Sequence, residues 1–67
     1  MNQDDFASLR EMDDWCRENG ATWALASHSG GTTYTATIIA DDGRKRFERN
    51  GRSVEDAVDG ALDRAQR

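Results

Sequence analysis

Hydrophobic residues near the beginning of the chain recur at steps of three and four, which is the spacing of one face of a helix. This spacing predicts a helix over residues 4–19. Asn2 or Asp4 can cap its start, and Asn19-Gly20 supplies a left-handed end. The apolar stripe of this predicted helix consists of Phe6, Leu9, Met12, Trp15 and Cys16.

Three later segments alternate between apolar and polar residues, as strands with one buried face do. We expect these strands over residues 21–27, 32–40 and 44–49. Residues 29–31 predict a flexible hairpin loop, and Asp42-Gly43 predicts a two-residue hairpin before the third strand. The predicted apolar face of the sheet carries Trp23, Leu25, Tyr34, Ala36, Ile38 and Phe47.

The last segment carries the clearest helix signals. Ser53, with Asp56 three residues later, resembles a capping box, and helical spacing of apolar residues follows. Gly60 falls on the predicted solvent face, either as a tolerated defect or as a point where a partner approaches the backbone. The face expected to lie on the sheet consists of Val54, Ala57, Val58, Ala61, Leu62 and Ala65.

These elements follow the order α-β-β-β-α, which predicts one α+β domain over residues 1–67. We expect a two-layer sandwich, with a three-stranded antiparallel sheet and both helices on one face. No segment approaches the roughly 20 apolar residues of a membrane span. The acidic N-terminus is unlike a secretory leader, and the single cysteine, Cys16, suits a reducing compartment. We therefore expect a cytoplasmic protein.

Part of this pattern resembles the second half of a double-stranded-RNA-binding domain. The resemblance rests on Tyr-Thr-Ala-Thr-Ile at 34–38, on Asp42-Gly43, and on Gly-Arg-Ser at 51–53, which opens the last helix. His28 and the glycines after it match the family's strand-loop region, although without its proline. The resemblance implies the α-β-β-β-α fold and recognition of an RNA duplex by its shape, through 2′-hydroxyl and phosphate contacts.

The phosphate-binding lysines of that family are missing from this chain. The family's helix motif is a Ser followed by two lysines, an Ala and a third lysine, and Ser53 and Ala57 match it. The three lysine positions fall on Val54, Glu55 and Val58. Because cations supply most of the affinity for phosphate, we expect the fold of this family without its RNA binding.

The net charge of −4 is unevenly distributed, with acids on the outer faces of both predicted helices. Because both helices should lie on the same side of the sheet, these acids should form one surface. The simpler interpretation is that these acids are only solvated. The functional interpretation is a surface that docks on a basic protein and mimics a nucleic acid. On that hypothesis the protein-binding residues are Asp4, Glu11, Asp14, Trp15, Glu18, Asp56, Asp59 and Asp63.

The sequence therefore favours a small non-enzymatic binding protein, or an inhibitor of a nucleic-acid-handling complex. In size and charge it is similar to small phage-encoded inhibitors, anti-CRISPR proteins among them. The alternative is a degenerate double-stranded nucleic-acid-binding domain that works through a basic segment. That segment is equally explained as an edge strand protected by charge, and a homodimer through the third strand or the threonine face is a third hypothesis. The basic segment consists of Arg44, Lys45, Arg46, Arg49 and Arg52.

Catalysis is not expected. Cys16 and His28 are the one residue pair that suggests a nucleophile and a base. Cys16, however, completes an apolar stripe, and His28 is expected in a mobile glycine loop. The sequence has no glycine-rich phosphate loop, metal-ligand spacing or pair of catalytic carboxylates, so we predict no cofactor and no metal.

Overall fold

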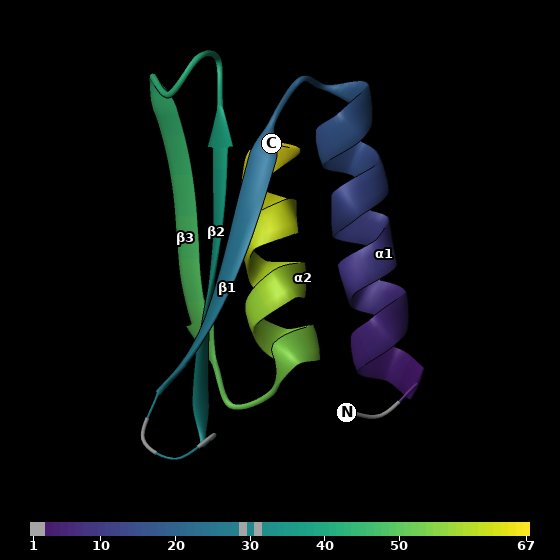
Figure 1. The fold of residues 1–67 in the computed structure, drawn as a ribbon, viewed down its shortest axis with the longest axis vertical. Helices are drawn as coiled ribbons and strands as arrows, with labels where there is room; N and C mark the ends of the chain where they lie inside the picture. Colours follow the sequence, from purple (N-terminus) through teal and green to yellow (C-terminus); the bar gives the residue numbers. More distant parts are fainter. Residues whose placement is uncertain (1–2, 29, 31) are drawn as a thin grey trace.

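The computed structural model describes residues 3–28, 30 and 32–67. Two helices flank three strands in chain order, and both helices lie on one face of the antiparallel sheet (Figure 1). The predicted α+β class and the α-β-β-β-α order are thus confirmed. The elements are α1 (Gln3–Glu18), β1 (Thr22–His28), β2 (Thr33–Ala40), β3 (Lys45–Gly51) and α2 (Val54–Ala65).

The sheet has the order β1-β2-β3, and its register assigns each side chain to one of two faces. Ala36 of β2 pairs with Leu25 of β1 and Arg49 of β3, and these three residues belong to the helix-covered face. The neighbouring Thr37 pairs with Ala24 and Glu48 on the opposite, open face. Alternation along each strand therefore separates an apolar face from a threonine-rich face, as predicted.

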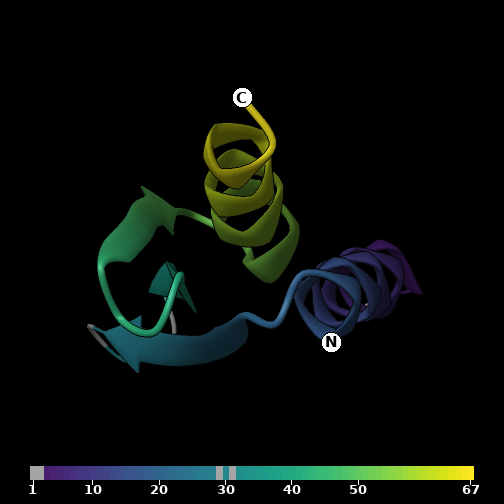
Figure 2. The same cartoon turned by 90° about the horizontal axis from the view of Figure 1, so that it is seen from above.

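The two helices cover the sheet unequally. α2 packs against β2 and β3, whereas α1 packs mainly against α2 and touches the sheet at β1. Figure 2, which looks along the helices, shows α2 above the sheet and α1 beside it, next to the start of β1.

The core forms where α2 meets α1 and the central strand. Its buried hydrophobic residues include all but one of the apolar positions predicted for the last helix, and Ala65 is half-buried. Phe6 corrects the predicted stripe of the first helix, because its side chain is 60% exposed. Asp5 and Ser8 are buried instead. The core consists of Met12, Cys16, Ala36, Ile38, Val54, Ala57, Val58, Ala61 and Leu62.

The connection between β2 and β3 differs from the predicted two-residue hairpin. It spans residues 41–44, and both Asp41 and Asp42 have a φ of 56°. Gly43 N–H donates to the Ala40 carbonyl at 3.1 Å, which closes a turn around these two aspartates. Aspartate is among the few non-glycine residues that adopt this conformation readily, so the left-handed pair lies one residue earlier than Asp42-Gly43.

The predicted end of the first helix is confirmed. Gly20 has a φ of 64°, and Ala21 N–H donates to the Cys16 carbonyl at 2.8 Å. Asn19 also donates its side-chain amide to the Trp15 carbonyl at 2.8 Å. The proposed cap Asn2, together with Ser29 and Gly31 of the predicted loop, lies outside the described residues.

The start of α2 is fixed by two capping oxygens. Ser53 Oγ accepts from the Asp56 N–H at 3.1 Å, as the capping pattern predicted. Asp5 Oδ1, from α1, accepts from the Glu55 N–H at 2.8 Å. Gly51 allows the helix to begin so close to β3, because a Cβ there would lie 2.5 Å from the Ala57 nitrogen. The cap, the inter-helix bond and the glycine together set how α2 crosses the sheet.

Gly60 does not lie on the solvent face, contrary to the prediction. It is half-buried, and a Cβ at this position would lie 3.2 Å from Cγ of Arg49. Because Gly60 has no side chain, the aliphatic part of the Arg49 side chain, on β3, can pack against α2 at this point. Neither sequence interpretation, a defect or a partner's approach, accounts for this contact.

Candidate functional site

Acidic residues of α1 and α2 lie on either side of a shallow groove between the two helices. Glu11 of α1 lines it from one side, and Asp59 and Asp63 of α2 line it from the other, with Leu62 and Gln66. These three carboxylates come from segments about 50 residues apart in the chain, and all three are exposed. Packing of α1 against α2 therefore brings together acids that were predicted on separate helices.

A second concentration of acids lies where α1 and α2 begin. Glu55 is half-buried here, and its pKa is raised by burial and by the carboxylates of Asp4, Asp59, Asp5 and Asp56. Asp4 and Asp5 belong to α1, so their effect on Glu55 means that charge from both helices meets at this point. We call the combined set the acidic surface: Asp4, Glu11, Glu55, Asp56, Asp59 and Asp63.

Glu55 is the acid that sequence reasoning did not assign to this surface. It occupies the second position of α2 and was considered only as a replaced lysine of the RNA-binding motif. Its neighbours from α1 could not be foreseen, because they depend on how the two helices pack. The one local signal was its place in the first helical turn, where acids are favoured.

Three other residues predicted for protein binding lie apart from this groove. Asp14 lines a separate hollow on the outer side of α1, together with Phe6 and Arg10. Glu18 is exposed at the last position of α1. Trp15 is half-buried and packs against the core. Glu11 lines this hollow as well as the groove, so it lies between Asp14 and the acids of α2.

The basic residues of the third strand are scattered. Arg46 lies on the open face and pairs with Glu48 at 3.0 Å, whereas Arg49 lies on the helix-covered face over Gly60. Arg44 precedes β3 and Arg52 follows it, at opposite ends of the strand. Arg44, Lys45, Arg46, Arg49 and Arg52 therefore do not make one patch.

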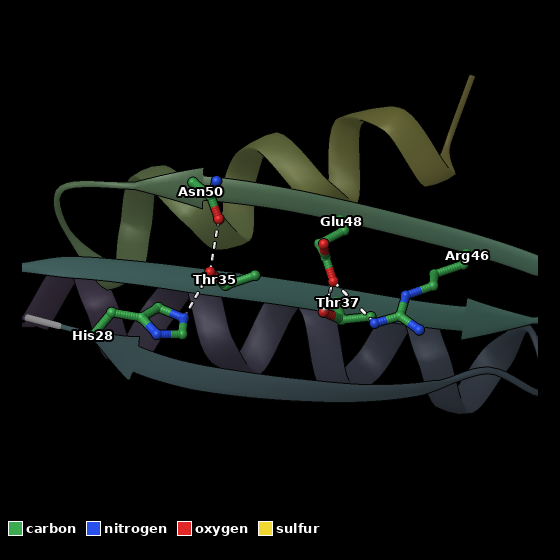
Figure 3. A network of polar contacts seen from close by, with 6 residues as sticks. All are labelled: His28, Thr35, Thr37, Arg46, Glu48 and Asn50. Atoms are coloured by element: carbon green, nitrogen blue, oxygen red, sulfur yellow. Dashed lines mark hydrogen bonds and ion pairs between the residues drawn. The ribbon is translucent and has the colours of Figure 1, made fainter.

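The open face of the sheet carries a polar network that spans all three strands (Figure 3). Thr35 Oγ1 donates to Asn50 Oδ1 at 2.6 Å and lies 3.1 Å from His28 Nε2. A hydroxyl has one proton to donate, and with that proton on Asn50, Thr35 can accept a hydrogen bond from the Nε2–H tautomer of His28. His28 is the last residue of β1, not part of a glycine loop as predicted.

A second cluster on the open face holds a carboxylate between two donors (Figure 3). Glu48 Oε2 accepts from Arg46 at 3.0 Å and from Thr37 Oγ1 at 3.1 Å. These hydrogen bonds and the positive charge of Arg46 lower the pKa of Glu48. Both donors face Glu48, so Arg46 is engaged within the protein rather than free to receive phosphate.

Cys16 and His28 are not brought together. Cys16 lies near the end of α1, beside the start of β1, whereas His28 lies at the far end of β1. Burial and the nearby charge of Asp13 raise the pKa of the Cys16 thiol, which disfavours the reactive thiolate. Among the described residues, no group of three or more His, Cys, Asp or Glu side chains could hold a metal ion.

Comparisons with protein-family models, with curated proteins and with solved structures found no match for this chain. Within the described ranges, neither helix has the length and apolar character needed to cross a bilayer.

Proposed function

We propose that this protein is a non-enzymatic binding module that docks its acidic surface on a basic, nucleic-acid-handling protein and thereby inhibits it. The observation that carries the proposal is that carboxylates from both helices line one groove, with Glu11 on one side and Asp59 and Asp63 on the other. Asp4 and Asp5 of α1 also act on Glu55 of α2 and help to raise its pKa, after the larger effect of burial. Concentrated like charge opposes folding, and a basic partner would relieve that repulsion.

The missing lysines support a partner other than RNA. Two of the three family lysine positions, Val54 and Val58, are buried at 2% and 0% exposure and face the core. The third, Glu55, belongs to the acidic surface. The helix that would grip phosphate in a double-stranded-RNA-binding domain thus presents carboxylates here. Similarity in size and charge to phage-encoded inhibitors suggests that the protein occupies a partner's nucleic-acid channel.

Electrostatic docking of this kind predicts how the association rate depends on salt. Complementary charge mainly accelerates association, and the acceleration falls as salt screens it. A purely solvated acidic face would instead give no specific binding at any salt concentration. Salt dependence of the association rate is therefore a direct signature of the proposed mode.

A competition experiment tests the proposal. A labelled RNA or DNA duplex is bound to a set of purified basic nucleic-acid-binding proteins, and this protein is added as competitor. The set includes the complexes that anti-CRISPR proteins inhibit. We expect displacement of the duplex from at least one of them. The variant Glu11→Gln/Asp59→Asn should lose this competition. The matched control Asp41→Asn/Asp42→Asn changes the net charge equally, and asparagine also tolerates the left-handed conformation there. Equal loss in both variants would argue against a defined acidic site.

Direct titration of the duplex with the protein alone addresses the alternative function. Binding through residues 44–52 would weaken steeply as salt rises and would disappear when Arg44 and Arg52 are neutralised. Such a result would replace the proposed function. We expect no binding even at low salt, because the five bases lie on both faces and at both ends of β3.

A further inference from the structure

The edge of β1 lacks the protection that the other edge of the sheet has. In the described ranges the strand order is β1-β2-β3, so β1 and β3 each have one edge without a neighbouring strand. Such an edge can pair with another chain unless charges block it. β3 carries Lys45, Arg46, Glu48 and Arg49 within seven residues. β1 reads TWALASH, without Asp, Glu, Lys or Arg, and six of its seven residues are exposed.

Trp23 adds exposed apolar surface to this uncharged strand. Its side chain is 37% exposed, and its Nε1 donates to Asp13 Oδ1 of α1 at 3.0 Å.

We propose that β1 pairs antiparallel with β1 of a second copy, which makes a homodimer with one continuous sheet. An antiparallel pairing of two identical edges is related by a two-fold axis and closes on itself. The axis runs perpendicular to the sheet, so both helical layers lie on the same face.

The other edge pairings are disfavoured by charge or by symmetry. Pairing β3 with β3 would bring the bases Lys45, Arg46 and Arg49 of both copies together along one seam, with Glu48 as the single acid of the strand. Like charges opposite one another destabilise a sheet. Pairing β1 with β3 leaves a free edge at each end and would grow into a fibre. Only the β1–β1 pairing is both closed and free of opposed charge. It also differs from a dimer through the third strand or the threonine face.

The molar mass in solution tests the pairing, by light scattering on a size-exclusion column. We expect the unmodified protein to have twice the 7.5 kDa mass of the chain. Ala26→Lys should be monomeric at the same concentration. Ala26 is exposed on the open face opposite Thr35, so the lysine does not enter the core. Gln66→Lys adds the same charge at the exposed end of α2 and should remain dimeric.

Amide hydrogen exchange of the unmodified protein decides the matter if Ala26→Lys fails to fold by circular dichroism. Alternate β1 amides should exchange more slowly as protein concentration rises, and the edge amides of β3 should not. A monomeric mass at millimolar concentration would overturn the proposal. A dimer that survives Ala26→Lys, or protection at β3 instead of β1, would overturn it as well.

Discussion

Asp5 and Glu55 join the two helices through one hydrogen bond, from the Glu55 backbone N–H to Asp5 Oδ1 at 2.8 Å. The first N–H groups of a helix have no partner within the helix. At α2 two of these groups have side-chain acceptors: Ser53, just before the helix, accepts from Asp56, and Asp5 of α1 accepts from Glu55. This capping role explains why Asp5 is buried at 8% exposure although its side chain is charged.

Asp5→Ala should destabilise the protein by about 1 kcal/mol, the typical cost of losing a capping side chain. For a domain of this size that corresponds to a fall in Tm of about 4–8 °C. Asp5→Asn should lose much less, because asparagine caps nearly as well as aspartate. Thermal unfolding followed by circular dichroism measures both variants. Asp4→Asn, one residue earlier and exposed, is the control; an equal loss there would contradict the capping role.

Gly51 and Gly60 should respond in opposite directions to the same substitution. Gly51→Ala places a Cβ against the backbone of α2, 2.5 Å from the Ala57 nitrogen, and should cost about 1–3 kcal/mol. Gly60→Ala meets only the flexible stem of Arg49 and gains helix propensity, so it should stabilise by up to about 1 kcal/mol. Urea denaturation measures both free energies. A Gly51→Ala protein as stable as the parent would disprove the close approach.

Stability should depend on pH through Glu55. Its pKa is raised in the folded protein, so folding is favoured while Glu55 is protonated, and this contribution is lost as pH rises through the folded pKa. The window begins near the ordinary glutamate pKa of about 4.3 and extends upward. Glu55→Gln should therefore be more stable than the parent at neutral pH and similar to it in acid. Unfolding temperatures across this range test the sign, and added salt should shrink the difference.

Glu48 should show the opposite pH dependence. Its pKa is lowered by Arg46 and Thr37, so it contributes stability above its unfolded pKa, and the contribution is lost as pH falls through the folded value. Arg46→Gln should raise the pKa of Glu48 more than Thr37→Val does, because the hydrogen bond from Arg46 is the larger cause. Titration of the side-chain carboxyl by NMR distinguishes the two variants. Equal pKa values in both would contradict this order.

Local signals in the sequence predicted the elements well and their contacts poorly. The spacing of apolar residues after Ser53 identified the buried face of α2, and Asn19-Gly20 identified the end of α1, because caps and periodicity act between neighbouring residues. Phe6 and Gly60 were misassigned, and the burial of Asp5 was not predicted, for the opposite reason. Asp5 and Gly60 contact residues far away in the sequence, and Phe6 remains exposed because no other element in the described part of the chain covers it. Neighbouring residues in the sequence carry no signal of such contacts.

The same limit applies to the candidate site. The acids of each helix could be named from the sequence, but Glu55 joined them only once α1 and α2 lay side by side. The scattering of Arg46 and Arg49 to opposite faces follows from strand alternation and was in principle predictable. Treating residues 44–52 as one basic segment hides this alternation.

The unequal attachment of the helices turns Cys16 into a built-in reporter. Among the described residues α1 packs mainly against α2 and touches the sheet at β1, so it can detach with little disturbance of the strands. Cys16 is the single thiol, and at 1% exposure it is shielded while α1 stays docked. The rate at which a thiol reagent labels this protein therefore measures how often α1 lifts away, with no engineered probe.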